Sequence, residues 1–96
     1  MIDRLESTFR DDFTIADRFG EKGIKDTYKS VFKHWKDDLK YLTEFVIVLN
    51  WKAWYWSDHG KMNYSRLYTD LWEEAHDWCC SNLKGEDLKY YLRTVD

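Results

Sequence analysis

Proline is absent from this 96-residue chain, and glycine occurs at only four positions, Gly20, Gly23, Gly60 and Gly85. Because these two residues most often interrupt regular structure, their scarcity indicates long helices or strands. The four glycines are then the expected ends of those elements. No linker, internal repeat or low-complexity segment is visible, so we expect a single domain over residues 1–96.

Cysteine and long apolar runs are also scarce. The two cysteines, Cys79 and Cys80, are adjacent and cannot cross-link distant segments, so nothing indicates an oxidising compartment. The longest apolar run, Phe45 to Leu49, is far shorter than the ~20 residues that a membrane-spanning helix needs. The first residues, MIDRLESTFRDD, lack the apolar stretch of a signal peptide. We therefore expect a cytoplasmic protein with no membrane association.

Aromatic residues, by contrast, are abundant, and the charge is nearly balanced. The chain has six Trp, seven Tyr and five Phe, more rings than a core of this size easily encloses. Some of these rings are therefore expected at the surface or in an interface, where Trp and Tyr are favoured. The formal net charge of −3 argues against a general nucleic-acid binder, which would carry a basic excess.

The spacing of apolar residues predicts an all-α fold. From Ile24 to Trp56 they recur in steps of three and four, which is the period of a helix with one core-facing stripe. This stripe comprises Ile24, Tyr28, Val31, Trp35, Leu39, Leu42, Val46, Leu49, Ala53 and Trp56. The pattern predicts one helix over about 22–58; a break at Asp37, which would cap a second helix, is the alternative.

A second helix is predicted over about 64–83, with Asn63 as its N-cap and Gly85 just after its end. The connection between the two helices is short, so they should form an antiparallel hairpin. Short terminal helices complete the predicted bundle, and Asp12 is a candidate cap within the N-terminal part. The apolar positions of these terminal helices are Ile2, Leu5, Phe9, Phe13 and Ala16, and Leu88, Tyr91 and Leu92.

Four residues of the first predicted helix form a second apolar face, away from the core stripe: Ile47, Trp51, Trp54 and Tyr55. A helix that is apolar nearly all round must be buried on two sides. The protein's own terminal helices could cover this face, or it could bind a second copy or another protein, since aromatic anchors dominate interfaces. Asn50 lies at the edge of the core stripe, where we expect a buried, hydrogen-bonded amide.

A lysine stripe lies beside the core stripe of the same predicted helix and comprises Lys25, Lys29, Lys33, Lys36 and Lys40. Such a stripe could contact phosphates or an acidic partner. It could equally be a solvated face whose side-chain stems cover apolar neighbours. With the adjacent rings, and with Lys40 or Lys52 for phosphate, it also suggests a nucleotide site.

Two clusters are candidates for metal or catalytic sites. The first is acidic and comprises Asp70, Glu73, Glu74 and Asp77. These residues could hold Mg²⁺ only together with carboxylates from a facing helix, where Glu44 is the nearest candidate. We therefore prefer to interpret them as a solvated acidic face. His76 and Cys80 have chelating spacing, and Cys79 is adjacent, but zinc needs two more ligands and a catalytic pair needs a third group. We expect no metal, no cofactor and no catalytic residue.

Three segments carry a resemblance: YLTEFVIVLNWKAWYW (41–56), RLYTDLWEEAHDWC (66–79) and LKGEDLKYYLRTVD (83–96). In their apolar and aromatic pattern they resemble a group of small uncharacterised helical proteins carried by phages and conjugative elements of gut bacteria, particularly Firmicutes. The resemblance implies a mobile-element setting, in which small accessory proteins often bind and block a host defence component such as a CRISPR nuclease. It implies no activity for any residue.

Together these observations predict a non-enzymatic protein-interaction module that binds another protein or itself through the aromatic face. The alternative is a small-molecule or nucleotide binder that uses the lysine stripe and the adjacent rings.

Overall fold

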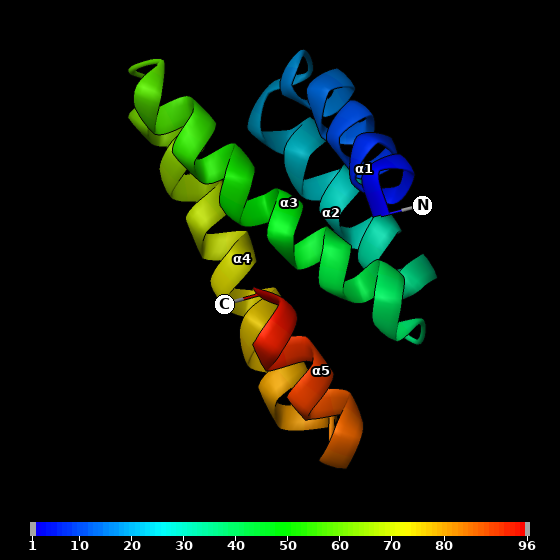
Figure 1. The fold of residues 1–96 in the computed structure, drawn as a ribbon. Coiled ribbons are helices and arrows are strands. Elements are labelled where there is room, and N and C mark those ends of the chain that lie inside the picture. Colours follow the sequence, from blue (N-terminus) through cyan, green and yellow to red (C-terminus); the bar gives the residue numbers. More distant parts are fainter. Residues whose placement is uncertain (1, 96) are drawn as a thin grey trace. The chain divides into compact units, whose positions relative to one another are not determined.

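The structure, a computed structural model, describes residues 2–95, with side chains described from Phe9 onward. This part of the chain folds into five helices and no strand, so the predicted all-α class is confirmed. Ile2 and Leu5, predicted as apolar contacts of the N-terminal helix, lie outside the residues whose side chains are described. The helices are α1 (Ile2–Asp17), α2 (Gly20–Trp35), α3 (Leu39–Asp58), α4 (Met62–Asn82) and α5 (Gly85–Val95) (Figure 1).

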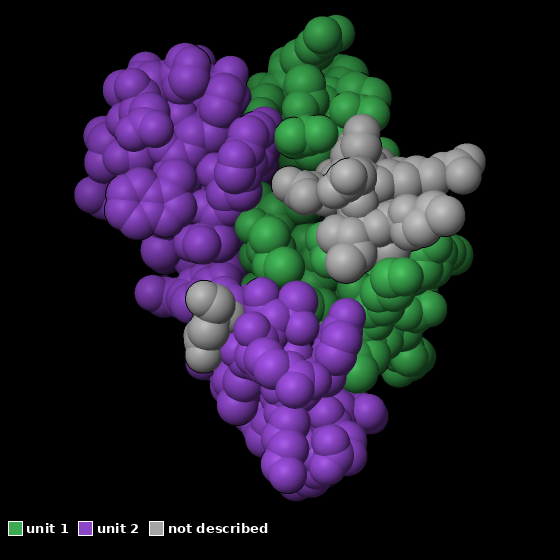
Figure 2. Space-filling view, viewed as in Figure 1, with its two compact units in different colours: residues 1–48 green, residues 49–96 purple. Residues whose placement is uncertain are grey.

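The chain divides into two compact units, residues 1–48 and 49–96 (Figure 2). The division falls within α3, so the first unit contains α1, α2 and the start of α3, and the second contains the end of α3, α4 and α5. The expectation of a single domain stays a prediction.

The continuous helix predicted over about 22–58 is wrong, because α2 ends at Trp35 and α3 begins at Leu39. The Asp38 carboxylate accepts a hydrogen bond from the backbone N–H of Tyr41 at 3.3 Å, the geometry of an N-cap. The alternative of a break was therefore right, although the cap is Asp38 and not Asp37.

Only residues 36–38 separate α2 from α3, which explains why the apolar period keeps its phase. The N–H of Lys36 donates to the carbonyl of Phe32 at 2.8 Å, and Lys36 retains helical dihedral angles. Beyond the turn, the N–H of Leu42 donates to the carbonyl of Asp38 at 2.8 Å. A turn of only three residues leaves little trace in the spacing of apolar residues.

The N-terminal part is one helix, α1, and Asp12 lies inside it and caps no second helix. Residues 18–19 form a tight turn into α2, where Gly20 has φ +77°, a conformation that favours glycine. Gly23 lies within α2 and not at a helix end as predicted. A Cβ there would lie 2.6 Å from the Cβ of Phe19 and 2.9 Å from the carbonyl oxygen of Ala16, so glycine permits the close approach of α1 and α2.

A cluster of rings forms the core of the first unit, with Phe45 of α3 at its centre. The Phe45 ring lies 5.5–6.1 Å from four others and makes edge-on, tilted and stacked contacts with them. The four rings are those of Phe9, Phe13, Tyr28 and Phe32. Phe45 is 1% exposed although it lies outside the predicted core stripe.

The second unit is built on α4, whose buried side chains lie along one face of the helix. The buried residues of α4 are Ser65, Leu67, Tyr68, Leu71, Ala75 and Cys79. The helix begins at Met62, after Lys61, so the predicted cap Asn63 lies inside its first turn. It ends at Asn82, and Gly85, with φ +59°, begins α5. In Figure 1, α5 folds back along the C-terminal half of α4.

Candidate interaction surface

The end of α3 presents two exposed tryptophans on one side of the helix. Trp51 is 41% exposed and Trp54, three residues later, is 66% exposed. Residues three apart are neighbours on a helix surface, so the two indoles form one apolar face. Asn50 is exposed on the same side, which corrects the expectation of a buried amide there. Exposed large rings held on a rigid helix are typical of a binding surface.

The other two residues of the predicted face are covered more fully. Tyr55 is half-buried, with its ring stacked 5.6 Å from that of Trp51 and 4.1 Å from that of His59. Ile47 is half-buried and belongs to the first unit. The structure therefore places Trp51, Trp54 and Tyr55 together in the second unit. These three residues, without Ile47, make up the aromatic face.

The opposite side of this part of α3 is fixed by a buried lysine. Lys52 is 3% exposed, and its Nζ lies 5.1–6.0 Å from the centres of four aromatic rings. A cation over ring faces is attracted by their negative potential, more strongly when water is excluded. The four rings are Trp51, Tyr55 and Trp56 of α3 and Tyr68 of α4. This contact holds Trp51 and Tyr55 in place, so their part of the exposed face is preorganised.

A groove of about 310 Å³ runs between α3 and α4 beside Trp54. At the floor of this groove the two helices are joined by a buried hydrogen bond. The hydroxyl of Ser65 donates to the carbonyl oxygen of Ala53 at 2.8 Å, and both residues line the groove. The lining is mixed, with two indoles, three hydroxyls, one amide and the methyl group of Ala53. Its residues are Asn50, Ala53, Trp54 and Ser57 of α3 and Ser65, Thr69 and Trp72 of α4.

A chain of contacts from α5 orients the Trp72 wall of this groove. The Trp72 ring stacks on His76, with centroids 4.9 Å apart and planes 6° apart. His76 Nδ1 in turn lies 2.6 Å from the hydroxyl oxygen of Tyr91, which is fully buried. Sequence reasoning weighed His76 only with Cys79 and Cys80, because no spacing rule connects it with a residue fifteen positions later.

Acidic residues flank the groove on both helices. Asp58 lies four residues after Trp54 on α3, and Glu73 lies four residues after Thr69 on α4, so each shares a side of its helix with a lining residue. The exposed face of α4 adds three further carboxylates, Asp70, Glu74 and Asp77. In the part of the chain whose side chains are described, none of these five carboxylates forms an ion pair within 4.0 Å.

The cysteines of α4 differ sharply from each other. Cys80 is exposed, with its Sγ 3.6 Å from His76 Nε2. Cys79 is buried, and burial raises the pKa of its thiol to about 11, against the opposing effect of a hydrogen bond with Tyr91. A thiol with such a pKa stays protonated at neutral pH and is a poor nucleophile. Within residues 9–95, no group of three or more His, Cys, Asp or Glu side chains could hold a metal ion.

The predicted lysine stripe is divided by the break between α2 and α3. Lys25, Lys29 and Lys33 are exposed on one side of α2, whereas Lys36 follows the end of that helix and Lys40 belongs to the first turn of α3. The five therefore do not lie on one helix as predicted. On α2, the exposed Asp26 is paired with Lys22 at 3.2 Å.

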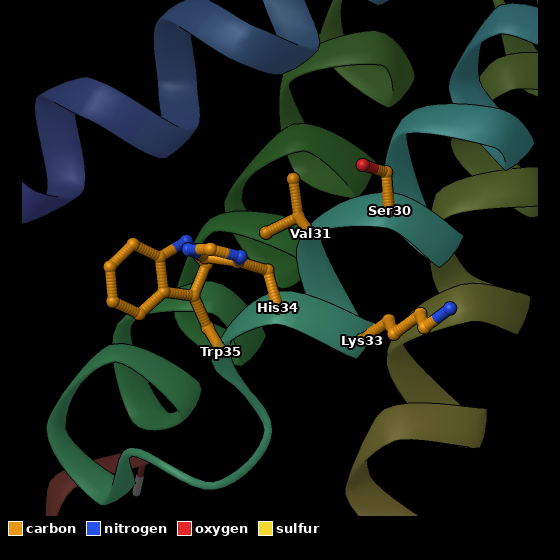
Figure 3. A pocket seen from close by; sticks show the side chains of 5 residues that line it. All are labelled: Ser30, Val31, Lys33, His34 and Trp35. Atoms are coloured by element: carbon orange, nitrogen blue, oxygen red, sulfur yellow. The ribbon is translucent and has the colours of Figure 1, made fainter.

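A shallow depression of about 510 Å³ lies beside the last turns of α2 and contains Lys33, His34 and Trp35 (Figure 3). The His34 and Trp35 side chains lie together on one side of the view, and Lys33 extends the other way. The Trp35 ring stacks at 4.0 Å on that of Tyr41, so one of its faces is already covered.

Comparison of the chain with known protein families, with curated proteins and with solved structures gives no match. Among the described residues, no helix combines the length and the apolar character needed to cross a membrane.

Proposed function

We propose that this chain is a non-enzymatic protein-interaction module that binds a partner protein through Trp51, Trp54 and the adjoining α3–α4 groove. The observation that carries the proposal is the 66% exposure of Trp54 beside the 41% exposure of Trp51 on one side of a helix. Tryptophan is the residue type most enriched among the few that supply most of the binding energy of an interface.

The rigidity of the face also supports binding. Trp51 lies against Lys52, and Trp72 is stacked on His76, which Tyr91 orients. Side chains that are already ordered lose little conformational entropy when a partner binds, and that loss is a main cost of association. The resemblance to mobile-element proteins makes a component of bacterial host defence, which the chain would inhibit, the first class of partner to test.

Capture from a bacterial lysate tests this proposal when the chain is compared with two matched variants. The double variant Trp51→Ala/Trp54→Ala removes the aromatic face, and Phe19→Ala removes a ring that is 73% exposed in the other unit. We expect a partner to be retained by the wild-type chain and by Phe19→Ala, and lost from the double variant. Identical captured proteins for all three chains would contradict the proposal.

A second candidate function is the binding of a phosphorylated small molecule in the depression shown in Figure 3. It is favoured by Lys33, His34 and Ser30 around one hollow, because these side chains can donate hydrogen bonds to phosphate. A ligand at one hundred times its Kd should stabilise the fold by about 2.7 kcal/mol. A panel of nucleotides that leaves the melting temperature unchanged would exclude this candidate.

A further inference from the structure

The surface around the groove is acidic. Asp58 and Glu73 lie on the sides of α3 and α4 that carry groove residues, and neither forms an ion pair among the described residues. Along α4, four carboxylates outnumber the one Arg or Lys side chain, Arg66, which lies three residues before Thr69 and so on the same side as Glu73. An interface places opposite charges against each other, so the complement of this surface is a basic one.

The indoles of the groove suit a particular kind of cation. In the part of the chain whose side chains are described, Trp54 has no ring or cation stacked against it. The planar guanidinium of arginine stacks on an indole face and is less strongly hydrated than the ammonium of lysine. The same chain uses a cation among rings at Lys52, on the other side of α3.

The polar lining supplies acceptors for the edge of such a guanidinium. Asn50 offers an amide oxygen, and Ser57 and Thr69 offer hydroxyl oxygens. The Thr69 hydroxyl donates its proton to the carbonyl of Ser65 at 2.9 Å, so its oxygen lone pairs face outward as acceptors. A guanidinium has five N–H donors and no acceptor, which matches this lining.

From these three features we infer that the α3–α4 groove binds an arginine-bearing segment of the partner protein, with the guanidinium against Trp54 and its charge opposite Asp58 and Glu73. The inference rests on the proposed function and names the chemistry of the partner. Apolar side chains of the same segment cover Trp51 and Trp72.

The test is a titration of the ¹⁵N-labelled chain with synthetic amphipathic peptides. Binding is monitored by NMR through the indole N–H signals of the tryptophans. The first peptide has leucine at every third or fourth position and arginine between; two analogues replace arginine with lysine or with glutamate. We expect the arginine peptide to shift the signals of Trp54 and Trp72 and to leave that of Trp35 in place. The lysine analogue should bind more weakly, and the glutamate analogue should not bind.

Two charge reversals on α4 provide the matched control. Glu73→Lys and Glu74→Lys change the net charge equally, but adjacent residues point about 100° apart on a helix, so only the first lies beside the groove. We expect Glu73→Lys to raise the Kd of the arginine peptide about tenfold, as loss of one ion pair and gain of one repulsion imply. Glu74→Lys should raise this Kd only about twofold, because it changes the overall charge without placing a lysine beside the groove.

Several results would overturn the inference. The arginine peptide could fail to bind, or the glutamate peptide could bind as tightly as the arginine peptide. Binding could leave the Trp54 signal unshifted, or Glu73→Lys and Glu74→Lys could change the Kd equally. Concentration-dependent self-association that is lost in Trp54→Ala would identify a second copy as the occupant instead. If the partner captured from lysate is lost from the double tryptophan variant but binds Glu73→Lys normally, the proposed function stands and this inference fails.

Discussion

Replacing Phe45 with alanine tests the packing of the first unit most severely. The ring is 1% exposed and lies within 6.1 Å of four other rings, so its removal leaves a cavity surrounded by rigid groups. Phe→Ala changes in cores cost about 3–5 kcal/mol, and lost ring pairs add to this, so we expect about 4–5 kcal/mol. A chain of this length is stable by about 5–14 kcal/mol, so much of that stability would be lost.

Urea titration followed by circular dichroism at the helix band measures the change. Phe19→Ala is the control, because it deletes the same ring from a position that is 73% exposed, and should cost less than about 0.5 kcal/mol. The melting temperature of Phe45→Ala should fall by at least about 15 °C. Equal, small effects of the two substitutions would refute the assignment of Phe45 to the core.

Four further results are expected. Lys52→Ala should destabilise the fold by about 2 kcal/mol or more in urea titration, because it removes the contacts of the ammonium with the rings and the packing of the aliphatic part of the side chain. The control Lys40→Ala, at an exposed position, should cost under about 0.5 kcal/mol. Ser65→Ala should cost about 1 kcal/mol, because it removes a buried hydrogen bond to α3. The pKa of the Cys79 thiol is raised from 9.0 to about 11, so the folded state holds this proton more tightly and stability should fall as pH rises through that window. In a series of melting curves, Cys79→Ala should make this fall smaller. Below pH 8, iodoacetamide should alkylate Cys80 and leave Cys79 unmodified until the chain unfolds.

The sequence was sufficient to predict the helical class and much of the core. Leu42, Val46 and Leu49 are buried as their spacing predicts, because one stripe of a helix must face the interior. The spacing of apolar residues does not locate the break after Trp35, since only residues 36–38 separate α2 from α3. Phe45 was missed because a position off the main stripe is buried only when further elements pack there.

The candidate surface was predicted in part. Trp51 and Trp54 were singled out because they are apolar residues that the core stripe does not need, and both are exposed. The burial of Lys52 could not be read from spacing, because it depends on rings contributed by two helices. The contact between His76 and Tyr91 likewise depends on how α5 folds back on α4.

The affinity of the captured partner for the Trp54→Ala chain tests the central claim most directly. Trp54 is 66% exposed, so its loss should change the free energy of unfolding by less than about 0.5 kcal/mol. If the indole is a principal anchor, the Kd measured by calorimetry should rise at least about thirtyfold, which corresponds to a loss of about 2 kcal/mol. A partner that binds the folded Trp54→Ala chain as tightly as the wild-type chain would contradict the account.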